Sequence, residues 1–518
     1  MTYTLITPSG GTQPLTAPAN ASTAQLVLER QAGGGFAAAV ATWAFAGATH
    51  DALRETLLYH GPEAEATLRL EAPDAALDLT FHLDLSQVTE TDGLVLRCPS
   101  HAAPAGLRWA RYAEALWDVQ SNQSPLGLAL PPAPTVPITV PPKRVAGLPD
   151  GDPVVATGMR LADLLPRLGA ALGLTVASDY FATGPGAGFA LVTGYAARGV
   201  AAPLALSLAG VLAECQRVFG TGWGYDPARA AWVVEPLPYY YRADRVYGTL
   251  DATDGVARGL VRQSVPTPGY VTTGSAEWGA TLPGSEAAFH RPMTWRLATG
   301  DPRLRADRTS GWLACDWALD AQRRAGASPA PYDAGVFVVD VGPAAPFILR
   351  QGLPEGSGVP DPATTANWRL SPAHSLLRQW AALGAGGAPL PAALLQAAGV
   401  GLAHAAAGPT APQAASVRGQ AYAEPTAALS LTQPLPDPTT WADPNGHRLA
   451  QPPTLPETLT LTCTLPLGTL AELVADPHGL LRVQLGSVRY QLAFLDTLAY
   501  RLADGQATLT LRPLAPYF

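Results

Sequence analysis

The sequence predicts a mainly β protein with α+β modules, built from several small barrel-like or sandwich-like domains that carry short helices. Three observations lead to this prediction. Hydrophobic residues make up 47% of the 518 residues and charged residues 14%, enough apolar material for several cores and the reverse of a disordered composition. Glycine and proline, 51 each, indicate many turns and short elements. Many short segments alternate apolar and polar residues, as half-buried strands do.

Residues 1–124 are predicted to form a β-rich N-terminal domain. Stretches such as "ATLRLEA" and "LDLTFHLDLSQV" have the period of two that is typical of strands. Asp92 and Gly93 separate two such runs and indicate a tight hairpin turn. Residues 51–61, "DALRETLLYHG", predict a short helix within this region.

Residues 125–149 are predicted to be a proline-rich linker. The part "PLGLALPPAPTVPITVPPKR" contains seven prolines. Proline removes a backbone donor and favours extended conformations. We therefore expect a stiff connector here rather than a packed element.

Residues 150–245 predict an α+β module that begins with a helix. Five leucines recur at helical spacing, which places them on one face: Leu161, Leu164, Leu165, Leu168 and Leu172. Pro166 is expected to kink this helix or to mark its first turn.

A second helix and a hairpin follow in "SLAGVLAECQRVFGTGWGYDPARAAWVVEP". Ser207 is suited to cap the helix, and Gly220 to end it. Two strands then turn around "DPAR", and the second ends on Glu235, which is expected to be buried. The aromatic run "PYYYR" is expected to project beyond the hairpin.

The rest of the chain divides into three predicted parts. Residues 246–350 form a β-rich middle domain, in which 311–326 is either a strand or a helix. Residues 351–455 are a helical or irregular region rich in proline and alanine. Residues 456–518 form a C-terminal β-rich module with a strand, a short helix and two hairpins, the last turning on Asp504 and Gly505.

Charge and cysteine content exclude several classes of protein. A net charge of −8 argues against a nucleic-acid-binding surface. The cysteines lie about 100 residues or more apart without zinc-ligand spacing, and each is expected to be a buried free thiol: Cys98, Cys215, Cys315 and Cys463. The sequence contains no signal-peptide pattern and no membrane span, so we expect a soluble product made in the cytoplasm.

No catalytic, cofactor-binding or metal-binding residue is predicted. The segments around Ser275 and Ser357 lack the nucleophile-elbow spacing or a supporting context. His82 and Asp84 are expected to be an ordinary surface pair, and Asp443 to His447 a β-turn rather than a calcium loop. A phosphate-binding GxxxxGK loop is excluded because Lys143 is the only lysine.

Paired carboxylates for glycoside hydrolysis remain an alternative, because such residues come from distant strands. The middle domain supplies six candidates, which we expect to be solvated turn residues and caps: Glu277, Glu286, Asp301, Asp307, Asp316 and Asp320.

The order of landmarks resembles that of tail-tip or baseplate hub proteins of tailed bacteriophages and prophages. The matching stretches cover about two thirds of the chain in short patches: "LDLSQVTETDGLVLRC", "ASDYF", "LSLAGVLAECQRVFGTGWGYD", "WVVEPLPYYYR", "YGTLDATDGVARGLV", "GWLACDWALDAQRR", "NWRLSPAHSLLRQW", "LPLGTLAELVADPHGLLRV" and "DGQATLTLRPL". The segments 125–150 and 383–455 depart from this pattern.

The resemblance implies a structural role without a cofactor. Copies of the chain would form a ring or hub that joins the tail tube to receptor-binding parts, in the virion tail, after assembly in the host cytoplasm. Its partners would be other tail or baseplate proteins and, indirectly, a host-surface glycan. Two alternatives stay open: a tail protein that binds glycans or a receptor, and a tail enzyme that degrades polysaccharide or peptidoglycan.

Overall fold

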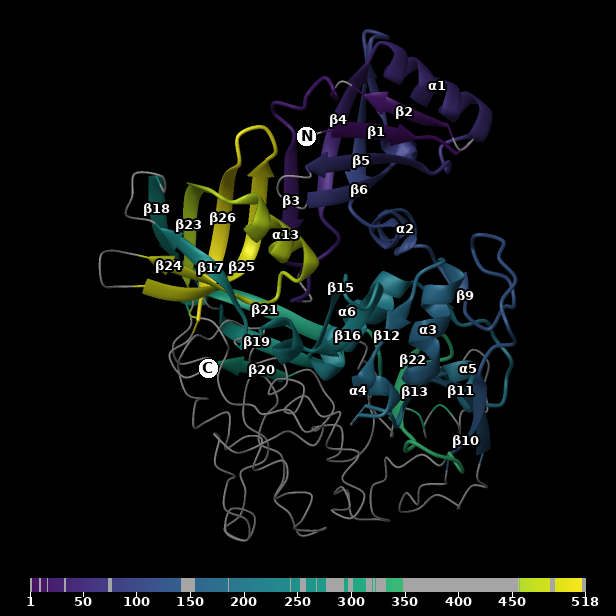
Figure 1. The fold of residues 1–518 in the computed structure, drawn as a ribbon. Coiled ribbons are helices and arrows are strands. Elements are labelled where there is room, and N and C mark those ends of the chain that lie inside the picture. Colours follow the sequence, from purple (N-terminus) through teal and green to yellow (C-terminus); the bar gives the residue numbers. More distant parts are fainter. Residues whose placement is uncertain are drawn as a thin grey trace.

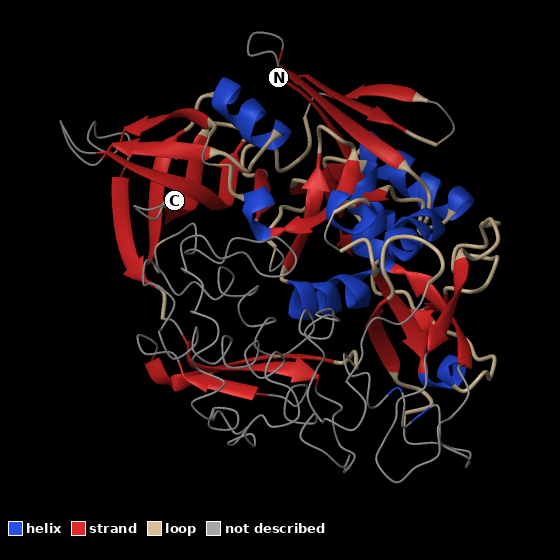
Figure 2. Ribbon diagram, turned by 90° about the horizontal axis from the view of Figure 1, so that it is seen from below, coloured by secondary structure: helices blue, strands red, loops and turns tan. Residues whose placement is uncertain are grey.

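The chain forms one large sheet, several small sheets and short helices, as seen in a computed structural model (Figure 1). The structure describes residues 2–8, 11–15, 17–31, 34–72, 77–140, 154–184, 186–242, 244–251, 258–266, 268–275, 293–296, 301–313, 319, 322, 332–347, 455, 457–484 and 490–514. Figure 2 shows that strands dominate this part of the chain and that helices occupy short stretches between them. The predicted mainly β, α+β class is confirmed, and none of the described sheets closes into a barrel.

The large sheet joins strands from both ends of the chain and from its middle. Its main path runs β18-β23-β26-β25-β3-β4-β8-β6-β5-β1-β2, with β24 beside β25, β17 beside β24, and β7 beside β8. The N-terminal strands are β1 (Thr2–Ile6), β2 (Thr12–Leu15), β3 (Gln25–Glu29), β4 (Val40–Ala46), β5 (Ala66–Ala72), β6 (Leu77–Leu83), β7 (Thr89–Thr91) and β8 (Val95–His101). The others are β17 (Val246–Asp251), β18 (Arg258–Ser264), β23 (Glu457–Thr464), β24 (Leu480–Gln484), β25 (Tyr490–Arg501) and β26 (Gln506–Pro513).

The N-terminal and C-terminal strands share one hydrophobic core. Antiparallel pairing of β3 with β25 sets Leu28 opposite Leu498. Trp43 and Leu511 are fully buried in the same core although they lie at opposite ends of the chain. The predicted boundaries of the separate domains stay a prediction, but segments 1–124 and 456–518 pack together through this core.

A second group of elements lies between residues 104 and 347. Its four-stranded sheet runs β10-β11-β13-β22, and its three-stranded sheet runs β12-β16-β15. The strands are β9 (Trp117–Asp118), β10 (Thr135–Val140), β11 (Val154–Arg160), β12 (Val176–Ala177), β13 (Phe189–Thr193), β14 (Ala205–Leu206), β15 (Thr221–Asp226), β16 (Ala231–Pro236) and β22 (Val336–Asp340). A further sheet runs β20-β19-β21, from β19 (Pro268–Ser275), β20 (Met293–Arg296) and β21 (Asp301–Ser310).

The described helical segments are short. They are α1 (Ala48–His60), η2 (Leu85–Gln87), α2 (Pro104–Tyr112), α3 (Leu161–Ala171), α4 (Asp179–Ala182), α5 (Gly194–Ala197), α6 (Leu208–Phe219), η3 (Leu237–Tyr240) and α13 (Leu467–Ala475). Across the described residues no helix is long and apolar enough to span a bilayer.

The two predicted helices of the 150–245 module are confirmed. The leucine face of α3 is buried, and α3 begins five residues before Pro166, so this proline does not mark the first turn. Ser207 accepts a hydrogen bond from the backbone N–H of Gly210, which caps α6. Gly220 ends α6 with a φ of 67°, a left-handed conformation that suits glycine. The hairpin of β15 and β16 follows as predicted.

The expectation of an unpacked connector at 125–144 is corrected over Thr135–Val140. This segment forms β10, which pairs with β11 along its whole length. Ile138 and Val140 are buried in a third core, so apolar burial outweighs the extended-linker composition. Pro137 is tolerated because β10 is an edge strand and needs ladder bonds on one side alone.

Other local predictions have mixed outcomes. The helix expected at 51–61 is α1, which begins three residues earlier. The turns at Asp92-Gly93 and Asp504-Gly505 are confirmed: both glycines have a positive φ, and each turn joins paired strands. Nearly all of the helical or irregular region predicted for 351–455 and nearly all of 314–331 lie outside the described residues.

Candidate functional site

The expectation that His82 and Asp84 form an ordinary surface pair is wrong. Asp84 follows β6 and is fully buried, and its Oδ1 accepts a hydrogen bond from Nε of Arg111 at 2.8 Å. The same oxygen accepts the backbone N–H of Ser86. Burial lowers the pKa of the nearby His82. This ion pair attaches α2 to the end of β6, and sequence reasoning missed it because Arg111 lies 27 residues away.

Two of the six candidate carboxylates are described, and both are held by neighbours in sequence. Asp301 accepts hydrogen bonds from Nε and Nη2 of Arg303, and these bonds lower its pKa to about 2. Asp307 accepts the backbone N–H of Thr309 at 2.9 Å. A carboxyl with so low a pKa is ionised at neutral pH, so Asp301 does not suit the role of a general acid. Glu277, Glu286, Asp316 and Asp320 lie outside the described residues.

The cysteine prediction is confirmed at three positions. Cys98, Cys215 and Cys463 are free and buried, and Cys315 lies outside the described residues. Burial raises the pKa of the Cys463 thiol to about 11, which keeps it protonated at neutral pH. Ser357 and the segment 443–447 also lie outside the described residues. In the described part of the chain, no group of three or more His, Cys, Asp or Glu side chains could hold a metal ion.

A polar feature of the described interior is a junction cluster where three distant segments of the chain meet. It contains Arg30, Gly35 and Phe36 from the N-terminal region, Gly224, Asp226, Tyr239, Tyr240, Tyr241 and Arg242 from the helix-hairpin module, and Asp476, His478 and Asp496 from the C-terminal module.

Arg30 ties all three segments together through backbone oxygens. Its guanidinium donates to the carbonyl of Leu495 at 3.0 Å and to that of Tyr240 at 2.9 Å. Its carbon Cζ also lies 4.6 Å from the ring centroid of Phe36 and 4.5 Å from that of Tyr241, in cation–π geometry. A buried guanidinium with this many fixed partners acts as a structural clamp, because moving any one segment leaves a charge desolvated and unpaired.

A line of alternating charges crosses from the hairpin to the C-terminal module. Nη1 of Arg242 donates to Oδ2 of Asp476 at 3.0 Å, and its Nη2 lies 3.8 Å from Oδ2 of Asp226. Tyr239 donates its hydroxyl to Asp226 at 2.7 Å. Although burial alone would raise the pKa of Asp226, this bond and two backbone N–H donors lower it. Asp226 is therefore ionised at neutral pH and holds Arg242 in place.

His478 lies in the middle of this cluster and is almost fully buried. Its ring packs against Phe36 and Tyr240, with centroid separations of 5.6 and 5.3 Å. Within the described residues, neither ring nitrogen has a hydrogen-bond partner. Burial, together with the positive charge of Arg30, lowers the pKa of His478 to about 3. The imidazole is therefore neutral at physiological pH and serves as an aromatic filler.

The tyrosine run at the end of the hairpin does not project as expected. Tyr240 is buried and donates its hydroxyl to the carbonyl of Val233 at 2.7 Å, and Tyr241 packs edge-on against Phe494. The C-terminal module packs against these rings and covers them. This contact joins segments that are distant in sequence, so the local pattern does not predict it. The predicted burial of Glu235 is confirmed: its carboxylate accepts the backbone N–H of Asp179 at the start of α4, and burial raises its pKa.

The exposed edge of the large sheet is a second candidate site, this time for binding rather than chemistry. Within the described residues β18 has one strand neighbour, β23. Residues 260–266 are exposed on both faces of the sheet, including Val261 at 55% and Val265 at 41%. The strand at the other end, β2, carries Pro14, which cannot donate to a further strand. The β18 edge lacks such a proline within Arg258–Ser264.

Comparisons with solved structures give weak likenesses, among them several phage and prophage tail proteins. No protein-family model matches the chain, and neither does any curated protein sequence. The solved structures include the prophage tail protein gp18 from Listeria monocytogenes EGD-e (TM-score 0.36, 7% identity, covering 99% of this chain and 94% of that one). They also include the tail protein from Neisseria meningitidis MC58 (TM-score 0.36, 10% identity, covering 100% of this chain and 97% of that one). Another is the 43 kDa tail protein of prophage MuSo2 from Shewanella oneidensis (TM-score 0.35, 8% identity, covering 100% of this chain and 99% of that one). Likeness at this level establishes neither a shared fold nor a shared function.

Proposed function

We propose that this protein is a structural component of a phage or phage-derived tail, forming the baseplate or tail-tip hub that links the tail tube to receptor-binding parts. The proposal starts from the resemblance of the sequence landmarks to hub proteins. The observation that carries it in the structure is the exposed, partly apolar edge strand β18 at the end of the large sheet.

An exposed edge of this kind favours pairing with another chain. Its backbone N–H and C=O groups form a row that a further strand can complete. The side chains of Leu260, Val261 and Val265 add apolar surface next to that row. Arg262, which lies 3.7 Å from Glu457 on β23, places one charge on the edge and helps to fix the register of any partner strand.

The occupant we propose for this edge is a second copy of the chain. Oligomers of identical chains are closed and symmetric in most cases, and head-to-tail contacts generate rings when the rotation closes. The modules at 150–245 and 246–350 would make the ring contacts, and β18 belongs to the latter. The rigid junction cluster supports this role because it fixes the three segments of each subunit relative to one another.

The remaining parts of the proposal concern partners and place. The partners would be other tail or baseplate proteins, and the chain would assemble in the host cytoplasm and reside in the virion tail. A net charge of −8 suits a wall past which DNA moves without being held. The protein would act without a cofactor and without catalysis. An enzymatic role predicts release of reducing sugars from cell-wall polysaccharide, and we expect none.

Mass photometry of the purified chain tests the ring contact. Wild-type protein is expected to assemble into species that are multiples of the 53.8 kDa subunit. The substitution Val261→Asp places a charge on the apolar edge and is expected to shift the distribution to the monomer. The control is Leu94→Asp, because Leu94 is also an exposed apolar residue, at 68%, but lies between β7 and β8, outside the two modules proposed to make the ring contacts. A wild-type chain that stays monomeric and fails to join tail particles contradicts the proposal.

A further inference from the structure

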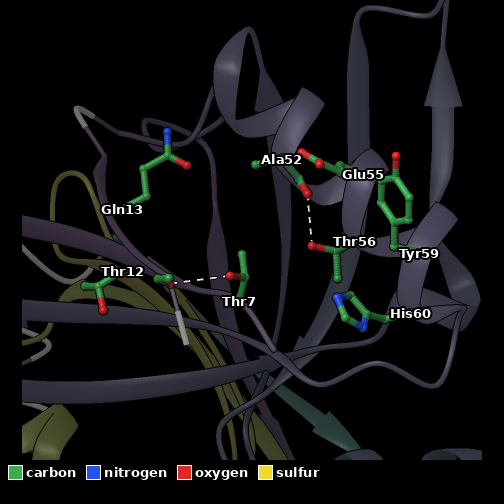
Figure 3. Close-up of a pocket in the computed structure, with 9 residues that line it drawn as sticks. Thr7, Thr12, Gln13, Ala52, Glu55, Thr56, Tyr59 and His60 are labelled. Atoms are coloured by element: carbon green, nitrogen blue, oxygen red, sulfur yellow. Dashed lines mark hydrogen bonds between the residues drawn. The ribbon is translucent and has the colours of Figure 1, made fainter. Parts of the chain in front are cut away.

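A pocket opens between the β1–β2 hairpin and α1, at the end of the large sheet opposite to β18. Figure 3 shows side chains from the hairpin on one side and side chains from α1 on the other. Its volume is about 340 Å³, at the small end of the range of sites that hold small ligands. Nine residues line it: Thr7, Gly11, Thr12, Gln13, Ala52, Glu55, Thr56, Tyr59 and His60.

The walls of this pocket are fixed by the fold. Leu53 anchors α1 in the main core, and the ring nitrogens of His50 bond Asp51 at 3.0 Å and Glu90 at 3.1 Å, which ties α1 to β7. On the opposite wall, antiparallel pairing sets Gln13 opposite Leu5. The pocket therefore exists before any ligand binds, which reduces the ordering cost of binding.

Within the described part of the chain, four polar side chains that line the pocket have no hydrogen-bond partner and can bind a ligand. The hydroxyl of Thr56 is used, since it donates to the carbonyl of Ala52 at 2.9 Å. The side chains of four other lining residues make no hydrogen bond to another described residue: Gln13, Glu55, Tyr59 and His60. These groups supply an amide, a carboxylate, a phenol and an imidazole, so both donors and acceptors converge on one small space.

Tyr59 adds an aromatic surface to this polar set. It is 77% exposed at the rim, although large aromatic side chains normally gain free energy by burial. An aromatic ring beside converging amide and carboxylate groups matches the two-sided chemistry of a sugar, which has an apolar face of C–H groups and a perimeter of hydroxyls.

We propose that this pocket binds a neutral saccharide. The charge of the lining decides against an acidic ligand: Glu55 is the one carboxylate, and neither lysine nor arginine is among the nine residues. An acidic sugar or a phosphate would meet the negative charge of Glu55 with no lysine or arginine in the lining to offset it. A purely apolar ligand would leave the polar groups of the pocket without partners, which is costly.

This site is independent of the assembly edge. The pocket lies at the β2 end of the sheet and β18 at the other end, and Figure 1 shows α1 and β18 far apart. A sugar can therefore bind to free subunits and to assembled ones alike. Sugar binding and self-association can each fail without the other.

Saturation-transfer NMR with the full purified chain tests the proposal. The probes are glucose, galactose, N-acetylglucosamine and N-acetylgalactosamine, with N-acetylneuraminic acid and inorganic phosphate as acidic comparisons. We expect saturation transfer to at least one neutral sugar and none to the acidic probes. Tyr59→Ala and Glu55→Gln are each expected to weaken that binding about tenfold or more.

The control is Leu58→Ala, because Leu58 is as exposed as Tyr59 on the same turn of α1 but does not line the pocket. It should bind the sugar as the wild type does, and so should Val261→Asp. Circular dichroism of each variant verifies that it is folded. The proposal is overturned if the folded wild type binds no neutral sugar of the panel, if the acidic probes bind instead, or if Tyr59→Ala binds as well as Leu58→Ala.

Discussion

His478 is a buried residue whose protonation makes the stability of this protein depend on pH. Its neutral imidazole fills a space between Phe36 and Tyr240, close to the positive charge of Arg30. A histidine in water takes up a proton near pH 6.5, whereas this one does so near pH 3. Between those values the unfolded chain binds a proton that the folded chain excludes, so stability falls as the pH falls.

Replacing this histidine by phenylalanine should remove that acid sensitivity. In His478→Phe the ring is kept and two buried nitrogens without partners are lost, so we expect the free energy of unfolding at pH 7 to be unchanged or higher by about 1–3 kcal/mol. Between pH 6.5 and 3 the variant should lose less stability than the wild type. Urea unfolding at a series of pH values measures this, and parallel curves for the two proteins would contradict the assignment.

At this scale, sequence reasoning succeeds where a residue and its partner are close along the chain. The cap at Ser207, the stop at Gly220 and the turn at Asp92 are local, and all three are as predicted. The sequence predicts an exposed Asp84 and gives no signal for His478, because the partners of both residues come from segments far away in the sequence.

At the scale of elements, two glycines mark a point where two backbones lie in direct contact. Gly35 donates its N–H to the carbonyl of Trp223, and Tyr225 donates to the carbonyl of Phe36. A Cβ placed on Gly224 would lie 2.6 Å from the Cα of Gly35, closer than such atoms approach. The N-terminal segment thus lies directly on β15, with no room for side chains between the two backbones.

A methyl group at this contact should separate the two elements. We expect Gly224→Ala to lower the free energy of unfolding by about 1–3 kcal/mol, the usual cost of overpacking. Gly468→Ala, at the start of α13, is the control, because a Cβ there meets no atom within 4 Å. Thermal unfolding followed by circular dichroism compares the variants, and equal melting temperatures would show that the backbones separate at no cost.

The strand β10 shows why the proline content of 125–144 leads to a wrong prediction of an unpacked linker at Thr135–Val140. Seven prolines in 125–144 favour an extended linker, but the alternation within "TVPITV" buries Ile138 and Val140. Because proline lacks a backbone N–H, a segment that contains it is disfavoured in the middle of a sheet but can still form an edge strand.

At the scale of the whole molecule, the ends of the chain belong to one sheet. The pairing of β3 with β25 joins residues that are more than 450 positions apart, such as Leu28 and Leu498. The sequence predicts both sets of strands but assigns them to separate domains, because no local pattern indicates which strands pair over such a distance. The neutral-sugar pocket and the β18 edge, at opposite ends of this sheet, were not predicted for the same reason.

The shared sheet predicts that the two ends unfold together. Leu28 and Leu498 are both buried and face each other across the β3–β25 pair. Leu28→Ala and Leu498→Ala should each lower the free energy of unfolding by about 2–5 kcal/mol. Both should lower the midpoint of the same calorimetric transition. Two transitions, each shifted by one variant alone, would mean that the ends fold separately.

The central claim is that this chain is a structural part of a tail, and electron microscopy of particles made without it tests that claim most directly. The encoding gene is deleted from the phage or prophage, and induced particles are compared with particles that carry a labelled copy of the chain. We expect the label at the tail end of intact particles, and tails that are absent or incomplete when the chain is missing. Whole, infectious particles in its absence would contradict the account.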